Sequence, residues 1–413
     1  MKIKIVLQIF SLLLLLLAQR AFPQHCNEEV IWDGSEKVLN YGIDTTGNWW
    51  FITQPFTKQY RLIVNGEQSE VALKIDGLTF SNDGTKWAAF SKEKERLYLF
   101  TNEGKITLPS LSMSGTLKYT PNSEKLVYSY KHENIETIVV GEKKFQIMNG
   151  TGDYYLSYGG ERVALLGRLS SGYVMNINGV ESPIYDALKP LGFWSDGQFV
   201  YAGKSGTTWQ IYKGNKSISD RFKDVSEVAI NIYGTVAAAL VTLPNNSKSS
   251  IIISDEYYEP LMGRQYDQAY DLVLHPELAM IGYRALDNGK NIVVLNSVEY
   301  AGGEYSGKPR FTYDGSELYF LGCNNDCFLN VNGKNYPILS DLTLSSYYAK
   351  KPNSETLAYS TSSAMIVRNL QFGTLYAGKM VDEISDPIYN RKLKRYEAIG
   401  RISDKLYLIH CTF

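Results

Sequence analysis

The sequence is short of proline and cysteine, and neither charge is in excess. Only 13 of its 413 residues are proline, while 31 are tyrosine, a composition that favours β-strands over disorder. The 42 basic residues are balanced by 43 acidic ones without a long run of either sign. No basic stretch of the kind that binds nucleic acid or an anionic membrane is present, so neither partner is expected.

Signatures of catalysis are also missing. The chain has no Gly-x-Ser-x-Gly elbow, no His-Glu-x-x-His pair and no phosphate-binding Gly-x-x-x-x-Gly-Lys loop. Its four histidines, His25, His132, His275 and His410, are scattered, and we interpret each as structural or solvated. We therefore predict no catalytic residue, no metal site and no cofactor.

One long apolar run is present, at the N-terminus. Lys2 and Lys4 precede 14 mostly apolar residues, 5–18, which are too few to span a bilayer comfortably. This pattern is typical of a signal peptide, which we assign to 1–24, with cleavage between Ala18 and Gln24. No second run of spanning length follows. The mature chain, 25–413, is expected to be exported to the periplasm or the extracellular space without membrane insertion.

A single pattern recurs through the mature chain: a short apolar stretch, a polar turn, and an apolar stretch of five to seven residues. The copies LTFSNDGTKWAAFS (78–91) and FTYDGSELYFLG (311–322) show it clearly. The turn positions lie 37 to 43 residues apart, an interval typical of repeat architectures. They are Gly47, Gly84, Ser123, Gly160, Gly197, Gly234, Glu277, Gly315, Ser354 and Lys392.

The repeated unit is predicted to be β. Asp-Gly and Asn-Gly pairs favour hairpin turns, and the stretches after them are apolar at consecutive positions, as in KWAAFS and TVAAALV. Strands that are buried on both faces need a packed layer on each side, which stacked sheets provide. We predict an all-β propeller of about ten four-stranded repeats of ~38 residues. Ordinary β-sandwiches or a solenoid are alternatives for the fold, and two β lobes are the alternative to one domain over 25–413.

The turn motifs resemble a known repeat. SNDGTKWAAF, TPNSEKLVYSY and KPNSETLAYS are similar to the core of the Pro-Asp repeat, found in exported bacterial propellers related to TolB and, distantly, to WD-repeat proteins. The resemblance extends over most of 40–400, although LVLHPELAM and IYNRKLKRY depart from it. It implies a propeller fold. Members of this family include binding scaffolds, non-catalytic domains of oligopeptidases and a few lyases.

The four cysteines fit the repeat as two pairs. Cys323 ends a second strand and Cys327 begins a third, so a disulfide across their hairpin is favoured over a metal or redox site in an oxidising compartment. Cys26 and Cys411 lie at the two ends. Residues 27–34 resemble a strand without its preceding hairpin, and 405–411 resemble a third strand without a fourth. We predict that these strands share one sheet and that Cys26 bonds to Cys411.

The function that follows is a non-enzymatic one. We predict a module that binds a protein or glycan of the cell envelope or exterior, with a polysaccharide lyase or hydrolase at the propeller channel mouth as the alternative. Adjacent aromatic residues can stack on such ligands. Tyr257 and Tyr258, beside the longest insertion of the repeat, are the best candidates for an exposed binding role.

Overall fold

A computed structural model of the protein describes residues 26–94, 96–108, 117–255, 260–338 and 347–413. Every regular element within these ranges is a β-strand, so no helix in them is long and apolar enough to cross a bilayer. The strands form ten antiparallel sheets, numbered 1 to 10 here in the chain order of their first strands. The predicted fold class, an all-β propeller built from ten repeats, is confirmed.

The strands of the first five sheets follow one another along the chain. Sheet 1 has β2 (Lys37–Ile43), β3 (Trp49–Phe56), β4 (Gln59–Val64) and β5 (Glu67–Gln68); sheet 2 has β6 (Lys74–Phe80), β7 (Trp87–Glu93), β8 (Arg96–Thr101) and β9 (Gly104–Thr107); sheet 3 has β10 (Lys118–Tyr119), β11 (Leu126–His132), β12 (Ile135–Val140) and β13 (Lys143–Met148); sheet 4 has β14 (Gly150–Leu156), β15 (Val163–Leu169), β16 (Gly172–Ile177) and β17 (Val180–Glu181); sheet 5 has β18 (Ala187–Phe193), β19 (Phe199–Ser205), β20 (Thr208–Lys213) and β21 (Lys216–Ser217).

The other five sheets continue the pattern, and the last also takes in β1. Sheet 6 has β22 (Asp224–Ile230), β23 (Val236–Thr242), β24 (Ser249–Asp255) and β25 (Leu261–Met262); sheet 7 has β26 (Gln268–Leu274), β27 (Ile281–Asp287), β28 (Lys290–Leu295) and β29 (Val298–Ala301); sheet 8 has β30 (Tyr305–Ser306), β31 (Arg310–Phe311), β32 (Leu318–Cys323), β33 (Cys327–Val331) and β34 (Lys334–Pro337); sheet 9 has β35 (Tyr348–Lys350), β36 (Thr356–Ser360), β37 (Met365–Asn369) and β38 (Leu375–Ala377); sheet 10 has β39 (Glu383–Ile384), β40 (Ile388–Asn390), β41 (Arg395–Ile402), β42 (Lys405–Cys411) and β1 (Cys26–Trp32). In sheets 8 and 10 the first strand is divided into two short segments.

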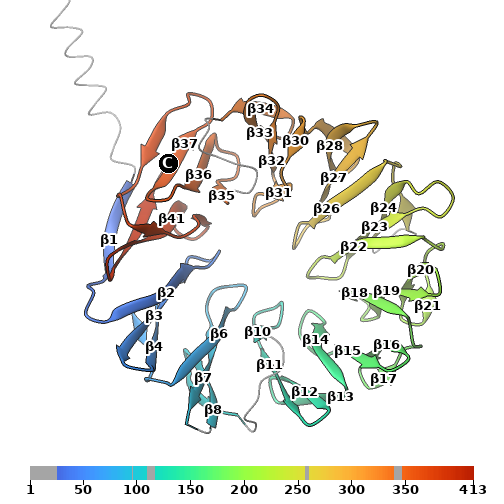
Figure 1. The fold of residues 1–413 in the computed structure, drawn as a ribbon, viewed down its shortest axis with the longest axis horizontal. Coiled ribbons are helices and arrows are strands. Elements are labelled where there is room, and N and C mark those ends of the chain that lie inside the picture. The colour runs from blue at the N-terminus through green and yellow to red at the C-terminus, as the bar shows by residue number, and fades with distance from the viewer. Residues whose placement is uncertain (1–25, 95, 109–116, 256–259, 339–346) are drawn as a thin grey trace, which may run out of the picture. The chain divides into compact units, whose positions relative to one another are not determined.

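The chain divides into two compact units. The first consists of Met1–Thr53, Val64–Gly66 and Tyr347–Phe413, and the second of Gln54–Ile63 and Glu67–Ser346. In the first unit, β1 lies at the edge of sheet 10 beside the strands from the other end of the chain (Figure 1). In the second unit, the first strands β6, β10, β14, β18, β22 and β26 lie along one edge of the stacked sheets (Figure 1).

The turns predicted from the repeat all join the first strand of a sheet to the second. Gly84, Gly197 and Gly315 have φ values of 69°, 81° and 70°, a conformation that glycine adopts at little cost. Ser123 takes the same place with a φ of 65°. Side chains also stabilise these turns, since Asp83 Oδ1 accepts hydrogen bonds from Ser81 Oγ at 2.6 Å and Thr85 N at 3.0 Å.

The hydrophobic core lies between neighbouring sheets. In β23 the first six residues are all buried, on both faces of the strand, as the apolar runs predicted. One face contacts sheet 5 through Ala237 and Ala239, and the other contacts sheet 7 through Ala238 and Leu240. Alanine is small enough to let the sheets stack closely, so β23 belongs to two clusters at once.

Charged side chains join the first strands of successive sheets in the second unit. Lys118 Nζ donates to the carbonyl of Tyr154, 3.2 Å away in the next sheet. Lys189 Nζ donates to the carbonyl of Ser226 at 2.9 Å. Charge-assisted bonds of this kind satisfy backbone groups where the first strands are irregular.

Candidate functional site

A pocket of about 190 Å³ lies on the first strands of sheets 3 to 6. Most of its lining comes from the two positions that precede the turn by five and four residues in each repeat. The stacking of the sheets brings these equivalent positions together, although they are about 37 residues apart in the chain. The lining residues are Lys118, Tyr119, Pro121, Tyr155, Leu156, Leu191, Gly192, Phe193, Ile230, Asn231 and Ile232.

Three aromatic side chains give the pocket a rigid wall. Tyr155 and Phe193 pack edge-on against the buried ring of Phe199, with ring centroids 5.7 and 5.0 Å away. Tyr119 and Tyr155 are half-buried, and burial raises the pKa of both hydroxyl groups. Both phenols are therefore protonated at neutral pH, and each has a hydrogen to donate.

Gly192 lets the first strands of sheets 5 and 6 approach each other at the pocket. The register of β18 shifts between Pro190 and Gly192, which marks a β-bulge. A Cβ atom at Gly192 would lie 2.7 Å from Cγ2 of Ile230 on the neighbouring sheet. A larger residue here would push the two strands apart or occupy the pocket.

Lys118 is the only charged residue among the described residues that line the pocket. Its Nζ lies 4.0 Å from the centroid of the Tyr154 ring, in addition to its bond to the Tyr154 carbonyl. Burial lowers the pKa of Lys118 to about 8, opposed by the negative charge of Asp153. The site therefore combines a cation, two phenols and an apolar wall, which suits an anionic ligand with an apolar part.

Two exposed tyrosines extend the aromatic surface beyond the pocket. Tyr158 and Tyr233 belong to the turns that follow the lining strands of sheets 4 and 6. Their ring centroids are 5.0 Å apart, and both side chains remain exposed. This contact between residues of sheets 4 and 6 gives a ligand that extends out of the pocket a surface for stacking.

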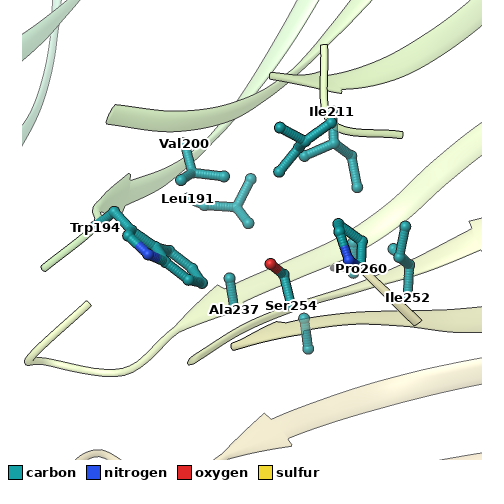
Figure 2. A pocket seen from close by; sticks show the side chains of 11 residues that line it. Leu191, Trp194, Val200, Ile211, Ala237, Ile252, Ser254 and Pro260 are labelled. Carbon is teal, nitrogen blue, oxygen red and sulfur yellow. The ribbon is translucent and has the colours of Figure 1, made fainter. Parts of the chain in front are cut away.

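A smaller cavity of about 20 Å³ lies between sheets 5 and 6, on the other side of Leu191. Figure 2 shows Leu191, Val200 and Trp194 around it, together with the hydroxyl group of Ser254. This volume holds about one water-sized sphere and its wall is apolar, so we interpret it as a packing gap in the core.

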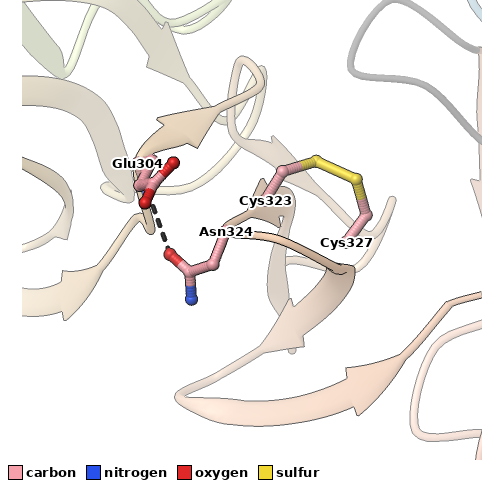
Figure 3. Close-up of a disulfide and its surroundings, with 4 residues drawn as sticks. All are labelled: Glu304, Cys323, Asn324 and Cys327. Atoms are coloured by element: carbon pink, nitrogen blue, oxygen red, sulfur yellow. Dashed lines mark hydrogen bonds between the residues drawn. A yellow bond between two sulfur atoms is a disulfide. The ribbon is translucent and has the colours of Figure 1, made fainter.

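The cysteines predicted from the sequence are brought together in two pairs. Cys26 is bonded to Cys411, and β1 pairs with β42 in register at these residues. Cys323 is bonded to Cys327 across the hairpin between β32 and β33, where Asn324 Oδ1 accepts a hydrogen bond of 3.1 Å from Glu304 N (Figure 3). Both bonds lie outside the pocket.

The other residues considered from the sequence are two tyrosines and the histidines. Tyr257 and Tyr258 lie outside the described residues. His275 is buried in the turn of sheet 7, where its Nδ1 accepts hydrogen bonds from Glu277 N at 3.2 Å and Leu278 N at 3.1 Å. Its role is structural. Within the described ranges, no group of three or more His, Cys, Asp or Glu side chains is placed to hold a metal ion.

Comparison with known proteins identifies no family. No family model matches the chain, and no curated protein does. Solved structures with a similar arrangement of strands include a eukaryotic initiation factor (13% identity, TM-score 0.48, covering 73% of this chain and 87% of that one) and the Dos1 propeller (10% identity, TM-score 0.41, 80% and 90%). An oligogalacturonate lyase from Vibrio parahaemolyticus is 8% identical, with a TM-score of 0.37 and coverage of 82% and 98%. A shared fold at such identities assigns no activity.

Proposed function

We propose that the protein is an exported binding module that holds a protein or glycan of the cell envelope or exterior against the first strands of sheets 3 to 6. The observation that carries this proposal is the pocket itself, because four sheets contribute an apolar and aromatic lining with one cation. Concave apolar sites with a few polar groups are the usual places for ligands to bind. The neighbouring Tyr158–Tyr233 pair supports a ligand larger than the pocket.

Export is supported by the state of the cysteines. All four cysteines of the chain are paired in disulfides, and such bonds persist in oxidising compartments. The N-terminal apolar run fits the same destination, although 1–24 lies outside the described residues. The turn motifs support membership of the TolB-like Pro-Asp repeat propellers as part of this proposal.

A pocket-filling variant tests the proposal. Ile232→Trp adds an indole at the pocket wall, and we expect it to reduce capture of the natural partner by at least tenfold. The wild type and the variant would be used as bait in pull-downs from the native envelope or medium and on a glycan array. Val298→Trp, on the exposed outer strand of sheet 7, is the matched control. Equal capture by wild type and Ile232→Trp would contradict the proposal.

The enzymatic alternative, a polysaccharide lyase or hydrolase, is favoured by one observation. A lysine whose pKa is lowered to about 8 is suited to act as a general base near neutral pH. Incubation with acidic and neutral polysaccharides, followed by measurement of new reducing ends, would reveal such an activity. If cleavage occurred in the wild type and were lost in Lys118→Met, this alternative would replace the binding module.

A further inference from the structure

No acidic residue balances the charge of Lys118 among the described residues that line the pocket. No carboxylate among the described residues lies within ion-pair distance of its Nζ. The Asp153 side chain, the acidic group that acts on it, is exposed and accepts a hydrogen bond from Thr151 Oγ1 at 2.9 Å. An ammonium group has three N–H donors, and the Tyr154 carbonyl and ring account for two directions. As far as the described residues go, one donor is left for a ligand, and a partly buried cation gains most from an anionic ligand.

The remainder of the lining is suited to an apolar group. Leu156, Leu191 and Ile230 contribute only aliphatic side chains. Asn231 is committed to its own turn, because its Nδ2 donates to Thr235 Oγ1 and its Oδ1 accepts from Thr235 N, both at 2.8 Å. A sugar ring buried here would bring more hydroxyl groups than Lys118 and the two phenols can pair, and each hydroxyl group left without a partner costs about 1–3 kcal/mol. An apolar side chain has no such cost.

The size of the pocket limits what can enter it. Its volume of about 190 Å³ is below the ~300–1,000 Å³ of pockets for drug-sized ligands. A single large side chain with its carboxylate is therefore the size of ligand that fits. The exposed Tyr158–Tyr233 pair adjoins the pocket, where it could contact the residues that precede a terminal one.

We propose that the pocket binds a carboxylate attached to an apolar or aromatic side chain, as at the C-terminal residue of a peptide, and that Lys118 is the cation that recognises it. This inference rests on the proposed binding function and names the ligand class for the same site. A free carboxylic acid has the same chemistry as a chain terminus, so the experiment includes both.

Calorimetric titration of the full mature protein tests the inference with three probes. These are N-acetylphenylalanine, its amide, and a hexapeptide that ends in phenylalanine. We expect the free acid to bind at least tenfold more tightly than the amide, because only the acid carries the charge that Lys118 recognises. The hexapeptide is expected to bind more tightly than the free acid if the natural source is a chain terminus, whereas equal affinity would indicate a free acid.

Two lysine variants separate recognition from stability. Lys118→Met should abolish the preference for the acid over the amide. Lys189→Met is the matched control, because Lys189 also joins neighbouring first strands but does not line the pocket. It should keep the preference. Thermal unfolding of both variants, and the circular dichroism of their strands, would confirm that each is folded.

Three results would overturn the inference. Equal binding of acid and amide by the wild type would show that the pocket accepts apolar groups without recognising the carboxylate. The proposed binding function would then stand. A preference for the acid that persists in Lys118→Met would assign recognition to another group. Failure of all probes to bind would also overturn it. The binding function itself fails separately, if Ile232→Trp captures the natural partner as the wild type does.

Discussion

The two disulfides join strands at the same Cα–Cα distance, 4.0 Å, but they constrain very different lengths of chain. Cys26 and Cys411 are 385 residues apart in sequence, whereas Cys323 and Cys327 are 4 apart. In the entropic model, a cross-link stabilises the folded state according to the length of the loop that it closes in the unfolded chain. The terminal bond should therefore matter more for stability than the hairpin bond.

The strands around the two bonds reinforce this difference. β1 is an edge strand in which residues 27–30 are exposed, and among the described strands it pairs only with β42 in sheet 10. β32 and β33 each have a paired strand on both sides in sheet 8. The hairpin disulfide thus joins two strands that are already hydrogen-bonded on both sides. The terminal disulfide secures a strand that has one neighbour and few buried side chains.

Removal of the terminal bond should have the largest effect. The double variant Cys26→Ser/Cys411→Ser is expected to lose about 4–5 kcal/mol of unfolding free energy, since the unfolded chain regains its freedom. Urea unfolding followed by tryptophan fluorescence would measure this. Hydrogen exchange of the β1 amides should rise in the same variant. A loss below about 1 kcal/mol would mean that strand pairing alone holds β1.

Substitution of a buried polar residue in sheet 10 shows whether hydrogen bonds inside this sheet contribute as much unfolding free energy as the terminal disulfide. Glu397 is buried, and its carboxylate accepts hydrogen bonds from Arg395 Nε at 2.6 Å and Asn390 Nδ2 at 2.7 Å. Glu397→Gln leaves the Arg395 charge without its partner, so we expect a loss of about 3 kcal/mol in the same urea experiment.

The matched control for this substitution is Glu383→Gln, also in sheet 10. Glu383 is exposed and lies 3.4 Å from Arg401 Nη1, and surface ion pairs of this kind contribute about 0–1 kcal/mol. Similar losses of unfolding free energy in the two variants would indicate that the burial of Glu397 does not make its ion pair more stabilising than the exposed one.

Removal of the hairpin bond should cost less. Cys323→Ser/Cys327→Ser is expected to lose about 2 kcal/mol, because the loop it closes is short. Asn324→Ala, which removes only the hydrogen bond to Glu304 N, should lose about 1 kcal/mol. Both would be measured by urea unfolding. A loss as large as that of the terminal double variant would reverse the comparison between the bonds.

The smallest expected effect is on how the unfolding free energy depends on pH, through His410 beside the terminal disulfide. Burial lowers the pKa of His410, which precedes Cys411; Arg395 lowers it further, and Glu397 and Glu29 oppose the change. A histidine whose folded pKa is depressed binds protons more readily when unfolded, so its stability contribution is present above about pH 6.5 and is lost as the pH falls.

Comparison of the wild type with His410→Leu between pH 8 and pH 5 checks this sign. The wild type should lose more unfolding free energy over that range than the variant does, because leucine has no proton to bind. Parallel curves would show that His410 is equally easy to protonate in the folded and unfolded protein.

The residues of the candidate site were not predicted from the sequence. Lys118, Tyr155 and Gly192 occupy the same position of three successive repeats, five residues before the turn. Alignment of the repeats could have shown that this position carries unlike residues in neighbouring copies. It could not have shown that these residues share a pocket, because that depends on the spacing and tilt of the sheets.

The sequence alone determined the repeat, its β character and the ten turns, because apolar runs and turn chemistry act over a few residues or one repeat. It also predicted the pairing of the four cysteines, because the place of each cysteine in the repeat assigns it to a strand. Tertiary structure alone decided which side chains meet across sheets: the pocket, and the place of Lys118 against Tyr154 of the next sheet with no ion-pair partner among the described residues. Such contacts depend on distances between residues tens of positions apart, which packing sets and local sequence does not encode.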